Sequence, residues 1–304
     1  MAKILFFGGK GGVGKTSCST AYAIANAKKG KKTLLVSTDP AHSISDLFNI
    51  NIGSSITYVN ENLFGIEIDP KKESEEYINQ IKSNLSDIIS PIILEEINKQ
   101  LDMASVSPGS HESALFDKIV EIVLDETEQF DTIIFDTAPT GHTIRLLSLP
   151  ELLSGWMDLL IKKRKKGISF KKMINKKQNE DPVLEILNRR KIRFERARIL
   201  FVEDKDVTFK FVTNAEKMPI EETKKSIILL NKYGINVSSI IINKILPDES
   251  NDEFWKNKKD KEKKHILKLK NEMPNYEYIQ IPLYNSDMDE ENINLMANYI
   301  FNII

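Results

Sequence analysis

Four glycines, two lysines and a threonine lie together near the start of this chain. Residues 9–16 read Gly-Lys-Gly-Gly-Val-Gly-Lys-Thr, the pattern of a phosphate-binding loop. In such a loop the backbone N–H groups surround phosphate oxygens, the lysine contacts the terminal phosphates and the hydroxyl holds Mg²⁺. The pattern therefore predicts a nucleotide site formed by Gly9, Lys10, Gly11, Gly12, Val13, Gly14, Lys15, Thr16 and Ser17.

Lys10 is not required by this pattern, which needs only the lysine at position 15. A cation at this position, on the outer side of the loop, is well placed to reach a phosphate bound by a second copy of the protein. Hydrolysis would then depend on assembly, so Lys10 is a candidate catalytic residue that acts across a dimer.

The residues on either side of the loop fit a strand and a helix. Lys3 to Phe7 is a short apolar run, and Thr16 to Lys29 is rich in alanine and ends before Gly30. This order of strand, glycine loop and helix is the context that the motif requires.

Two aspartates each follow an apolar, β-branched run. Asp39 begins Asp-Pro-Ala-His-Ser, and Asp136 begins Asp-Thr-Ala-Pro-Thr-Gly-His-Thr. Ligands bind at the carboxyl ends of the strands in open α/β sheets, so both carboxylates are expected to face the loop. Asp136 fits the role of orienting Mg²⁺ beside Thr16, and Asp39 that of positioning or deprotonating the attacking water. The alternative for each is an aspartate that caps a helix or forms a turn.

Proline, glycine and small residues surround both aspartates, as expected of loops that change shape when the γ-phosphate leaves. His42 and His142 lie in these segments. Each either senses that change or forms a hydrogen bond with nearby backbone.

Composition limits the class of protein. The 304 residues contain 43 basic and 44 acidic side chains, so no overall field attracts nucleic acid. The one cysteine, Cys18, excludes an internal disulfide and is expected in the core. No secretory segment and no uncharged apolar run of about 20 residues is found, which leads us to expect a soluble, cytoplasmic protein.

Apolar runs separated by helical stretches predict an α/β fold with a doubly wound, mostly parallel sheet. We expect one domain over residues 1–304, with a helical subdomain inserted as residues 69–131 and 149–208. The strands are expected at Lys3–Phe7, Thr33–Ser37, Leu63–Ile68, Thr132–Phe135, Phe209–Thr213, Val237–Ile242 and Tyr278–Ile281.

Two apolar stripes have helical spacing, one over residues 116–124 and one over 149–160, and the simplest interpretation is that they pack on one another. The lysine-rich segments 162–177 and 256–264 are either solvated connections or docking sites for an acidic membrane or receptor. The tail, 291–304, carries apolar residues but no basic residue, which favours a closing helix packed on the sheet.

Taken together, the loop and the segments that begin at Asp39 and Asp136 resemble one family. It comprises the ATPases that target tail-anchored membrane proteins and their relatives that drive arsenite pumps. The resemblance extends to Leu149-Pro150, Asn214-Ala215-Glu216, Glu222-Thr223 and Asn243, so it covers most of the chain.

The resemblance implies a homodimer with ATP and Mg²⁺ at its interface, in which Lys10 crosses to the partner's ATP and Asp39 activates water. Glu216, Asn243 and Pro282 would contact the nucleoside or base. The helical subdomains would join into an apolar groove for a client transmembrane helix, which would be delivered to a membrane, with a membrane receptor as a candidate partner. The two stripes would then partly face the client.

The sequence also departs from the family. Many targeting members have a Cys-x-x-Cys pair that binds zinc between subunits, and residues 247–264 contain no cysteine, so no zinc is expected. Pump-driving members use several thiolates and usually fuse two ATPase halves, whereas this chain has one cysteine and one loop. A chaperone for hydrophobic helices is therefore the leading hypothesis, and a pump-driving ATPase is the alternative. A scaffold bound to membrane or DNA is a third, and no nucleic-acid partner is expected.

Overall fold

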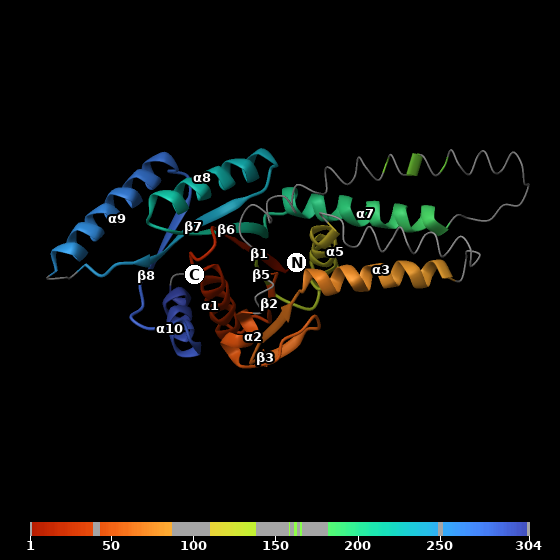
Figure 1. The fold of residues 1–304 in the computed structure, drawn as a ribbon, viewed down its shortest axis with the longest axis horizontal. Coiled ribbons are helices and arrows are strands. Elements are labelled where there is room, and N and C mark those ends of the chain that lie inside the picture. Colours follow the sequence, from red (N-terminus) through yellow and green to blue (C-terminus); the bar gives the residue numbers. More distant parts are fainter. Residues whose placement is uncertain are drawn as a thin grey trace, which may run out of the picture.

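The computed structural model describes residues 2–38, 43–86, 110–137, 182–248 and 252–302, together with residues 158, 161, 162 and 165. Figure 1 shows these residues as a central sheet with helices on both faces. The strands are β1 (Lys3–Gly8), β2 (Thr33–Ser37), β3 (Thr57–Asn60), β4 (Leu63–Glu67), β5 (Thr132–Asp136), β6 (Val207–Asn214), β7 (Val237–Ile245) and β8 (Glu277–Pro282). The helices are α1 (Lys15–Lys28), α2 (Ser43–Phe48), α3 (Pro70–Ser86), α5 (Ser110–Asp125), α7 (Pro182–Glu203), α8 (Lys217–Lys232), α9 (Glu253–Glu272) and α10 (Glu290–Phe301).

The strands form one eight-stranded sheet in the order β3-β4-β2-β5-β1-β6-β7-β8. Every neighbouring pair is parallel except β3 and β4. The predicted doubly wound, mostly parallel sheet is therefore confirmed, and each of the seven predicted strands is present with ends that differ by no more than three residues.

The edge strand β3 was not predicted from the sequence. It forms a hairpin with β4 through Glu61 and Asn62, and Asn62 has a φ of 61°. Asparagine is one of the residues that tolerate this left-handed backbone. β3 is only four residues long and half-exposed, so it lacks the continuous apolar run by which buried parallel strands are recognised.

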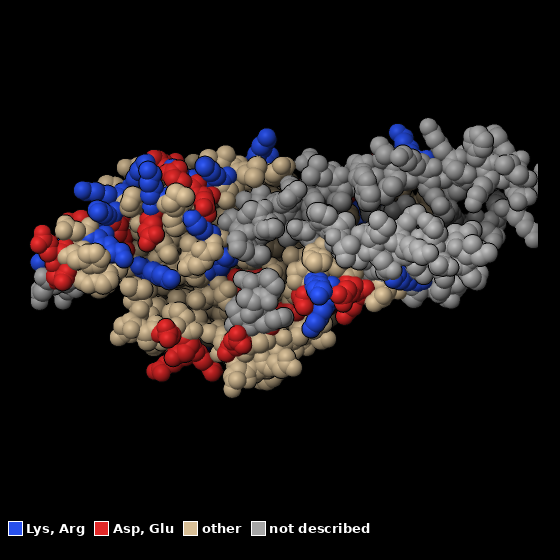
Figure 2. Space-filling view, in the orientation of Figure 1, with Lys and Arg blue, Asp and Glu red and all other residues tan. Residues whose placement is uncertain are grey.

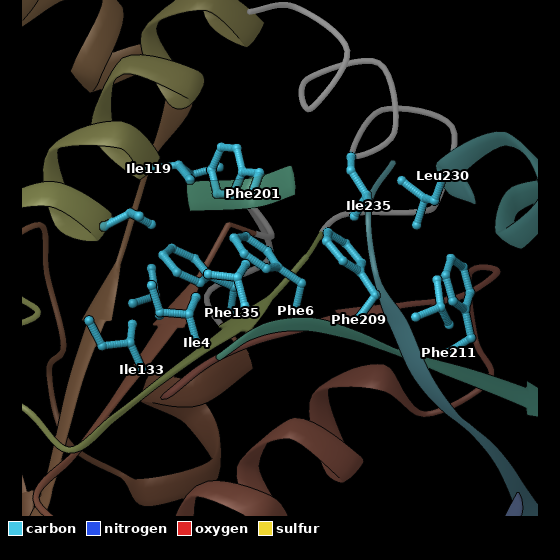
Figure 3. Close-up of a cluster of buried hydrophobic side chains, with 14 of the residues drawn as sticks. Ile4, Phe6, Ile119, Ile133, Phe135, Phe201, Phe209, Phe211, Leu230 and Ile235 are labelled. Atoms are coloured by element: carbon cyan, nitrogen blue, oxygen red, sulfur yellow. The ribbon is translucent and has the colours of Figure 1, made fainter. Parts of the chain in front are cut away.

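Alternate residues of the central strands enter two separate cores. Ile4 and Phe6 of β1 point to one face of the sheet, while Leu5 and Phe7 point to the other. In the first core the ring of Phe6 stacks on Phe135 at 4.5 Å and on Phe209 at 4.8 Å, as Figure 3 shows. Burial on both faces explains why these strands are almost entirely apolar.

Different helices cover the two cores. Helices α5, α7, α8 and α9 contribute to the core around Phe6, and α1, α2 and α10 contribute to the core around Phe7. Ile293, Met296 and Ile300 of α10 are buried, and α10 packs against α1. The predicted closing helix at the carboxyl end of the chain is therefore confirmed.

The predicted stripe over residues 116–124 belongs to α5. Its buried members Phe116, Ile119, Val120 and Val123 pack in the core around Phe6, and Phe116 meets Phe194 of α7 at 5.3 Å. This stripe thus packs on the sheet and on α7. The stripe over 149–160 lies outside the described residues, apart from Asp158.

Helices α3 and α7 extend away from the sheet beside α5 (Figure 1), and α3 packs on α5. Ion pairs also join this layer. Arg190 of α7 bonds to Asp117 of α5, and Arg193 bonds to Asp125 at 2.9 Å. Burial raises the pKa of the Asp117 carboxyl to about 6, because its cost outweighs the stabilisation by Arg190.

The lysine-rich segment 256–264 lies within α9 and is helical, so it is not an irregular connection. Lys259 bonds to the buried Glu262 at 3.0 Å, and Lys263 bonds to Asp248 at 3.3 Å. Figure 2 shows acidic side chains among the basic ones over α8 and α9. None of the helices in the described part of the chain is long and apolar enough to cross a bilayer.

Candidate functional site

The site lies at the carboxyl edge of the sheet, between β1 and β5. These two strands are neighbours, but the chain leaves β1 toward β2 on one side and leaves β5 toward β6 on the other. This is the switch point at which open α/β sheets form a crevice for ligands. The predicted phosphate loop follows β1, and Asp136 ends β5.

Close contacts require glycine at two positions of the loop. A Cβ on Gly9 would lie 2.3 Å from the carbonyl oxygen of Val212 in β6, which is backbone and cannot move aside easily. Gly14 has a φ of 94°, and its Cβ would lie 2.3 Å from Nδ2 of Asn243. The loop therefore lies directly against β6 and β7, and its final glycine turns the chain into α1.

The two predicted metal-site residues are in contact. The Thr16 hydroxyl donates a hydrogen bond of 2.6 Å to Oδ2 of Asp136, although the residues are 120 positions apart in the chain. The Asp136 side chain is fully buried. A hydroxyl and a carboxylate are hard oxygen donors of the kind that Mg²⁺ prefers, so this pair fits a magnesium ion that is also bound by nucleotide phosphates.

The backbone around Asp136 is tied to its neighbours on both sides. The N–H of Thr38, at the end of β2, donates to the Asp136 carbonyl at 2.9 Å. The Thr137 hydroxyl donates to the Phe7 carbonyl at 2.7 Å. Asp39 follows Thr38 in the chain, but residues 39–42 lie outside the described residues, as do His142 and the rest of the segment after Thr137.

Three lysines lie in or beside the loop. The Nζ of Lys15 lies 3.5 Å from the Lys10 carbonyl oxygen, and the Nζ of Lys244 lies 3.4 Å from the Gly12 carbonyl oxygen. The Nζ of Lys10 points instead to α8, where it pairs with Oε1 of Glu222 at 3.1 Å. The loop thus combines backbone N–H groups with a concentration of positive charge, which suits a polyphosphate.

Asn243 holds the loop in place from β7. Its Nδ2 donates to the Val13 carbonyl at 2.9 Å, and its Oδ1 accepts from the N–H of Lys244, also at 2.9 Å. Lys244 has a φ of 60°, which is uncommon for a residue other than glycine and is often found at functional sites. Sequence reasoning missed Lys244, and its only signal was its position directly after Asn243.

The other predicted nucleotide-binding residues lie at the same edge of the sheet. Glu216 is exposed and immediately precedes α8, and Pro282 ends β8. Ser17 lies in the first turn of α1, while Gly11 and Gly12 are exposed in the loop. The contacts of Glu216, Asn243 and Pro282 with a nucleoside stay a prediction.

Sequence reasoning also missed Glu67, a buried residue at the end of β4. Its Oε1 accepts from the N–H groups of Ile44 and Ser45 at 2.9 and 3.0 Å, and its Oε2 accepts the Ser45 hydroxyl at 2.7 Å. A carboxylate at the amino end of a helix is favourable. Glu67 therefore fixes the start of α2, a few residues after Asp39.

Cys18 is fully buried in α1, as predicted for a core residue. Burial, and secondarily the charge of Asp136, raises the pKa of its thiol, which keeps the thiol protonated. Within the described ranges no group of three or more His, Cys, Asp or Glu side chains is arranged to hold a metal ion. The expected lack of zinc stays a prediction.

Comparison with known proteins assigns this chain to a class. Residues 2–301 match the family model described as the anion-transporting ATPase, so the chain belongs to the anion-transporting ATPase family. The fold and the loop agree with this assignment, because both are those of a phosphate-loop ATPase. The chain is thus an enzyme that hydrolyses ATP, a reaction that in such proteins uses Mg²⁺.

Individual relatives carry two kinds of name. The chain is 39% identical to the "Putative arsenical pump-driving ATPase 2" of Aquifex aeolicus over 281 residues, which is 92% of each chain. It is 31% identical to the "ATPase GET3" of Malassezia globosa over 98% of this chain and 90% of that protein. It is 33% identical to the "ATPase GET3B" of Arabidopsis thaliana over 82% of this chain and 66% of that protein.

Proposed function

We propose that this protein is a nucleotide-gated homodimer that binds the hydrophobic transmembrane segments of tail-anchored proteins in the cytoplasm and delivers them to membranes. The observation that favours it over metalloid transport is the cysteine content. The full sequence has only Cys18, which is buried and protonated, whereas soft metalloid ligation needs several accessible thiolates.

The arrangement of the helices supports binding of a long apolar client. In this proposal residues 69–131 and 149–208 form a helical subdomain, and two such subdomains meet across the dimer. Helices α3 and α7 extend beyond the sheet as this requires (Figure 1). A client helix of about 20 residues is about 30 Å long, and each large apolar side chain shielded from water contributes about 1.5–3 kcal/mol.

In the proposed chemistry each group has one task. The loop N–H groups and Lys15 would hold the triphosphate, Thr16 and Asp136 would hold Mg²⁺, and Asp39 would position or deprotonate the attacking water. The ion, when bound, neutralises charge that develops on the phosphates. Lys10 enters from the partner subunit and stabilises the same charge, an effect of about 10³- to 10⁵-fold for a cation supplied in this way.

Binding of a tail-anchored segment tests the function directly. The purified protein is mixed with a reporter that ends in a tail-anchored transmembrane helix, with and without ATP. We expect a soluble complex whose yield depends on the nucleotide. The matched control replaces alternate leucines of the same helix with serine and should not be retained, while equal recovery of both reporters would contradict the proposal.

Two substitutions test the chemistry. Asp39→Asn and Lys10→Ala should each retain ATP binding and lose turnover. Binding is measured with a fluorescent ATP analogue, and turnover is measured as phosphate release. Unchanged hydrolysis in either variant would show that its assigned role is wrong.

A pump-driving ATPase is the second candidate, because the Aquifex aeolicus relative carries that name at 39% identity. It predicts that arsenite or antimonite stimulates hydrolysis. The presence of a single buried cysteine predicts no such response, so clear stimulation would favour the second candidate over the first.

A further inference from the structure

The side chain of Lys10 is bound within its own subunit. Its ammonium lies 3.1 Å from Oε1 of Glu222, and the two side chains are 36% and 41% exposed. The Lys10 carbonyl oxygen lies 3.5 Å from the ammonium of Lys15, so the backbone of Lys10 belongs to the phosphate loop. Only the side chain of Lys10 reaches outward to α8.

Glu222 is the carboxylate of α8 that is available to this lysine. The adjacent Glu221 bonds to Lys224 at 2.7 Å and thus faces along its own helix. Thr223 is buried, and the Ser226 hydroxyl donates to the Glu222 carbonyl at 2.8 Å. The rotation of α8 about its axis is therefore fixed by packing, and this rotation directs Glu222 toward the loop.

We propose that Glu222 is a positioning residue that holds Lys10 on its own subunit until a second copy presents a triphosphate. This rests on the proposed function, in which Lys10 acts across the dimer. An ammonium cannot pair closely with Glu222 and also reach the other subunit's phosphates. Pairing in one subunit and action in the other are therefore alternatives, and dimerisation exchanges one carboxylate for a more highly charged phosphate group.

The exposure of the pair sets the size of the effect. Exposed ion pairs in proteins are weak and are screened by salt, so Glu222 should weaken dimerisation without preventing it. Removing the negative charge should lower the protein concentration that gives half-maximal hydrolysis by about two- to fivefold. A Lys10–Glu222 ion pair of this strength breaks readily when ATP-loaded subunits meet. At low protein concentration it still reduces hydrolysis, because fewer subunits dimerise.

The experiment measures ATP hydrolysis per subunit as a function of protein concentration for Glu222→Gln. We expect the midpoint to fall by about two- to fivefold at low salt, with a smaller shift at high salt, while the rate at saturating protein concentration does not fall. Glu221→Gln is the matched control, because it removes a carboxylate of the same helix that pairs with Lys224. An unchanged midpoint, or a large loss of the saturating rate, would overturn the proposal.

A double-mutant cycle separates an effect of the Lys10–Glu222 ion pair from a merely structural effect on α8. ATP-dependent dimerisation is measured by sedimentation for Lys10→Met with and without Glu222→Gln. If Glu222 acts through Lys10, the second substitution has no further effect on dimerisation. A shift of equal size in both backgrounds would contradict the proposal.

The two ideas can fail separately. If Lys10→Met leaves hydrolysis intact, the role of Lys10 across the dimer is wrong and the proposed chemistry fails with it. If Lys10→Met abolishes hydrolysis while Glu222→Gln behaves as Glu221→Gln does, only the proposed positioning role of Glu222 is wrong.

Discussion

The carboxyl edge of the sheet and the layer of helices α3, α5 and α7 are held together by different forces. At the edge, hydrogen bonds join residues from distant parts of the chain: the bond of Thr16 with Asp136 is partly buried, and that of Asn243 with Val13 is buried. In the helical layer, α5 and α7 meet through apolar contacts and through ion pairs that are at least partly exposed.

This difference matters because the two kinds of contact resist movement differently. A hydrogen bond has a preferred length and angle, so the phosphate loop has one defined position. Apolar contacts are non-directional, and exposed ion pairs contribute little. The site is therefore built for precision, and the helical layer is better suited to a change of arrangement during an ATPase cycle.

The largest expected effect is on the apolar contact between α5 and α7. Phe194 is 2% exposed and packs on Phe116, so Phe194→Ala should lower the free energy of unfolding by about 3–5 kcal/mol. Urea unfolding of the variant and the wild type measures this loss. Ile192→Ala in the same helix is the control, because Ile192 is 55% exposed and should cost little. Similar losses in both variants would show that α7 is not anchored through this face.

A smaller effect, confined to chemistry, is expected at the sheet edge. Asp136→Asn keeps the size of the side chain but removes its charge, and hydrolysis should fall by about 100-fold or more because Mg²⁺ is held less well. Steady-state kinetics over a range of magnesium concentrations measures it. The unfolding midpoint is the check on folding, and hydrolysis that stays at the wild-type rate would remove Asp136 from the site.

Lys210 tests whether a buried charge within the sheet lowers the stability of the folded protein. It is buried in β6, where its Nζ lies 2.8 Å from the Ser239 hydroxyl and over the ring of Tyr22. Burial lowers its pKa from 10.5 to about 8, opposed by the charge of Glu277 and supported by that of Lys3. Between pH 8 and 10 the unfolded chain therefore binds more protons at this residue than the folded chain does.

The free energy of unfolding should accordingly rise with pH in this range, by on the order of 1–3 kcal/mol from Lys210. In Lys210→Met this contribution should be absent. The measurement is the difference between the variant and the wild type in urea unfolding at pH 8 and at pH 10, which removes contributions from other groups. A difference that does not change with pH would show that Lys210 is not effectively desolvated.

The smallest effect is expected for an exposed ion pair between the helices. Arg193→Gln removes the pair with Asp125, whose side chains are 42% and 49% exposed. The loss should be less than about 1 kcal/mol and should disappear in high salt. A loss comparable to that of Phe194→Ala would mean that charge, and not apolar packing, anchors α7.

Much of the fold was predictable because it depends on local patterns. Short apolar, β-branched runs located each parallel strand among the described residues. In β1, β2 and β5 these runs are nearly continuous because both faces of the strand are buried. The exposed strand β3 has no such run and was missed. The approach of Asp136 to Thr16 was also predictable, because parallel strands bring their carboxyl ends to one edge.

Other features of the site were not predictable, because the residues involved are ordinary in the sequence. Glu67 has no motif around it, and its importance comes from the two N–H groups of α2 that it meets. Glu222 was visible only as part of a resemblance, and its partner Lys10 is 212 positions away.

The sequence by itself determined the phosphate loop, the order of the parallel strands along the chain, and the lack of cysteines for thiolate chemistry. These depend on residue types and on spacing over a few positions. Only the tertiary structure decided that Asn243 and Lys244 support the loop, that the α5 stripe packs on the sheet, and that Lys10 pairs with Glu222. The reason is physical: such contacts depend on the order of strands in the sheet and on the rotation of each helix, which packing of the whole chain sets.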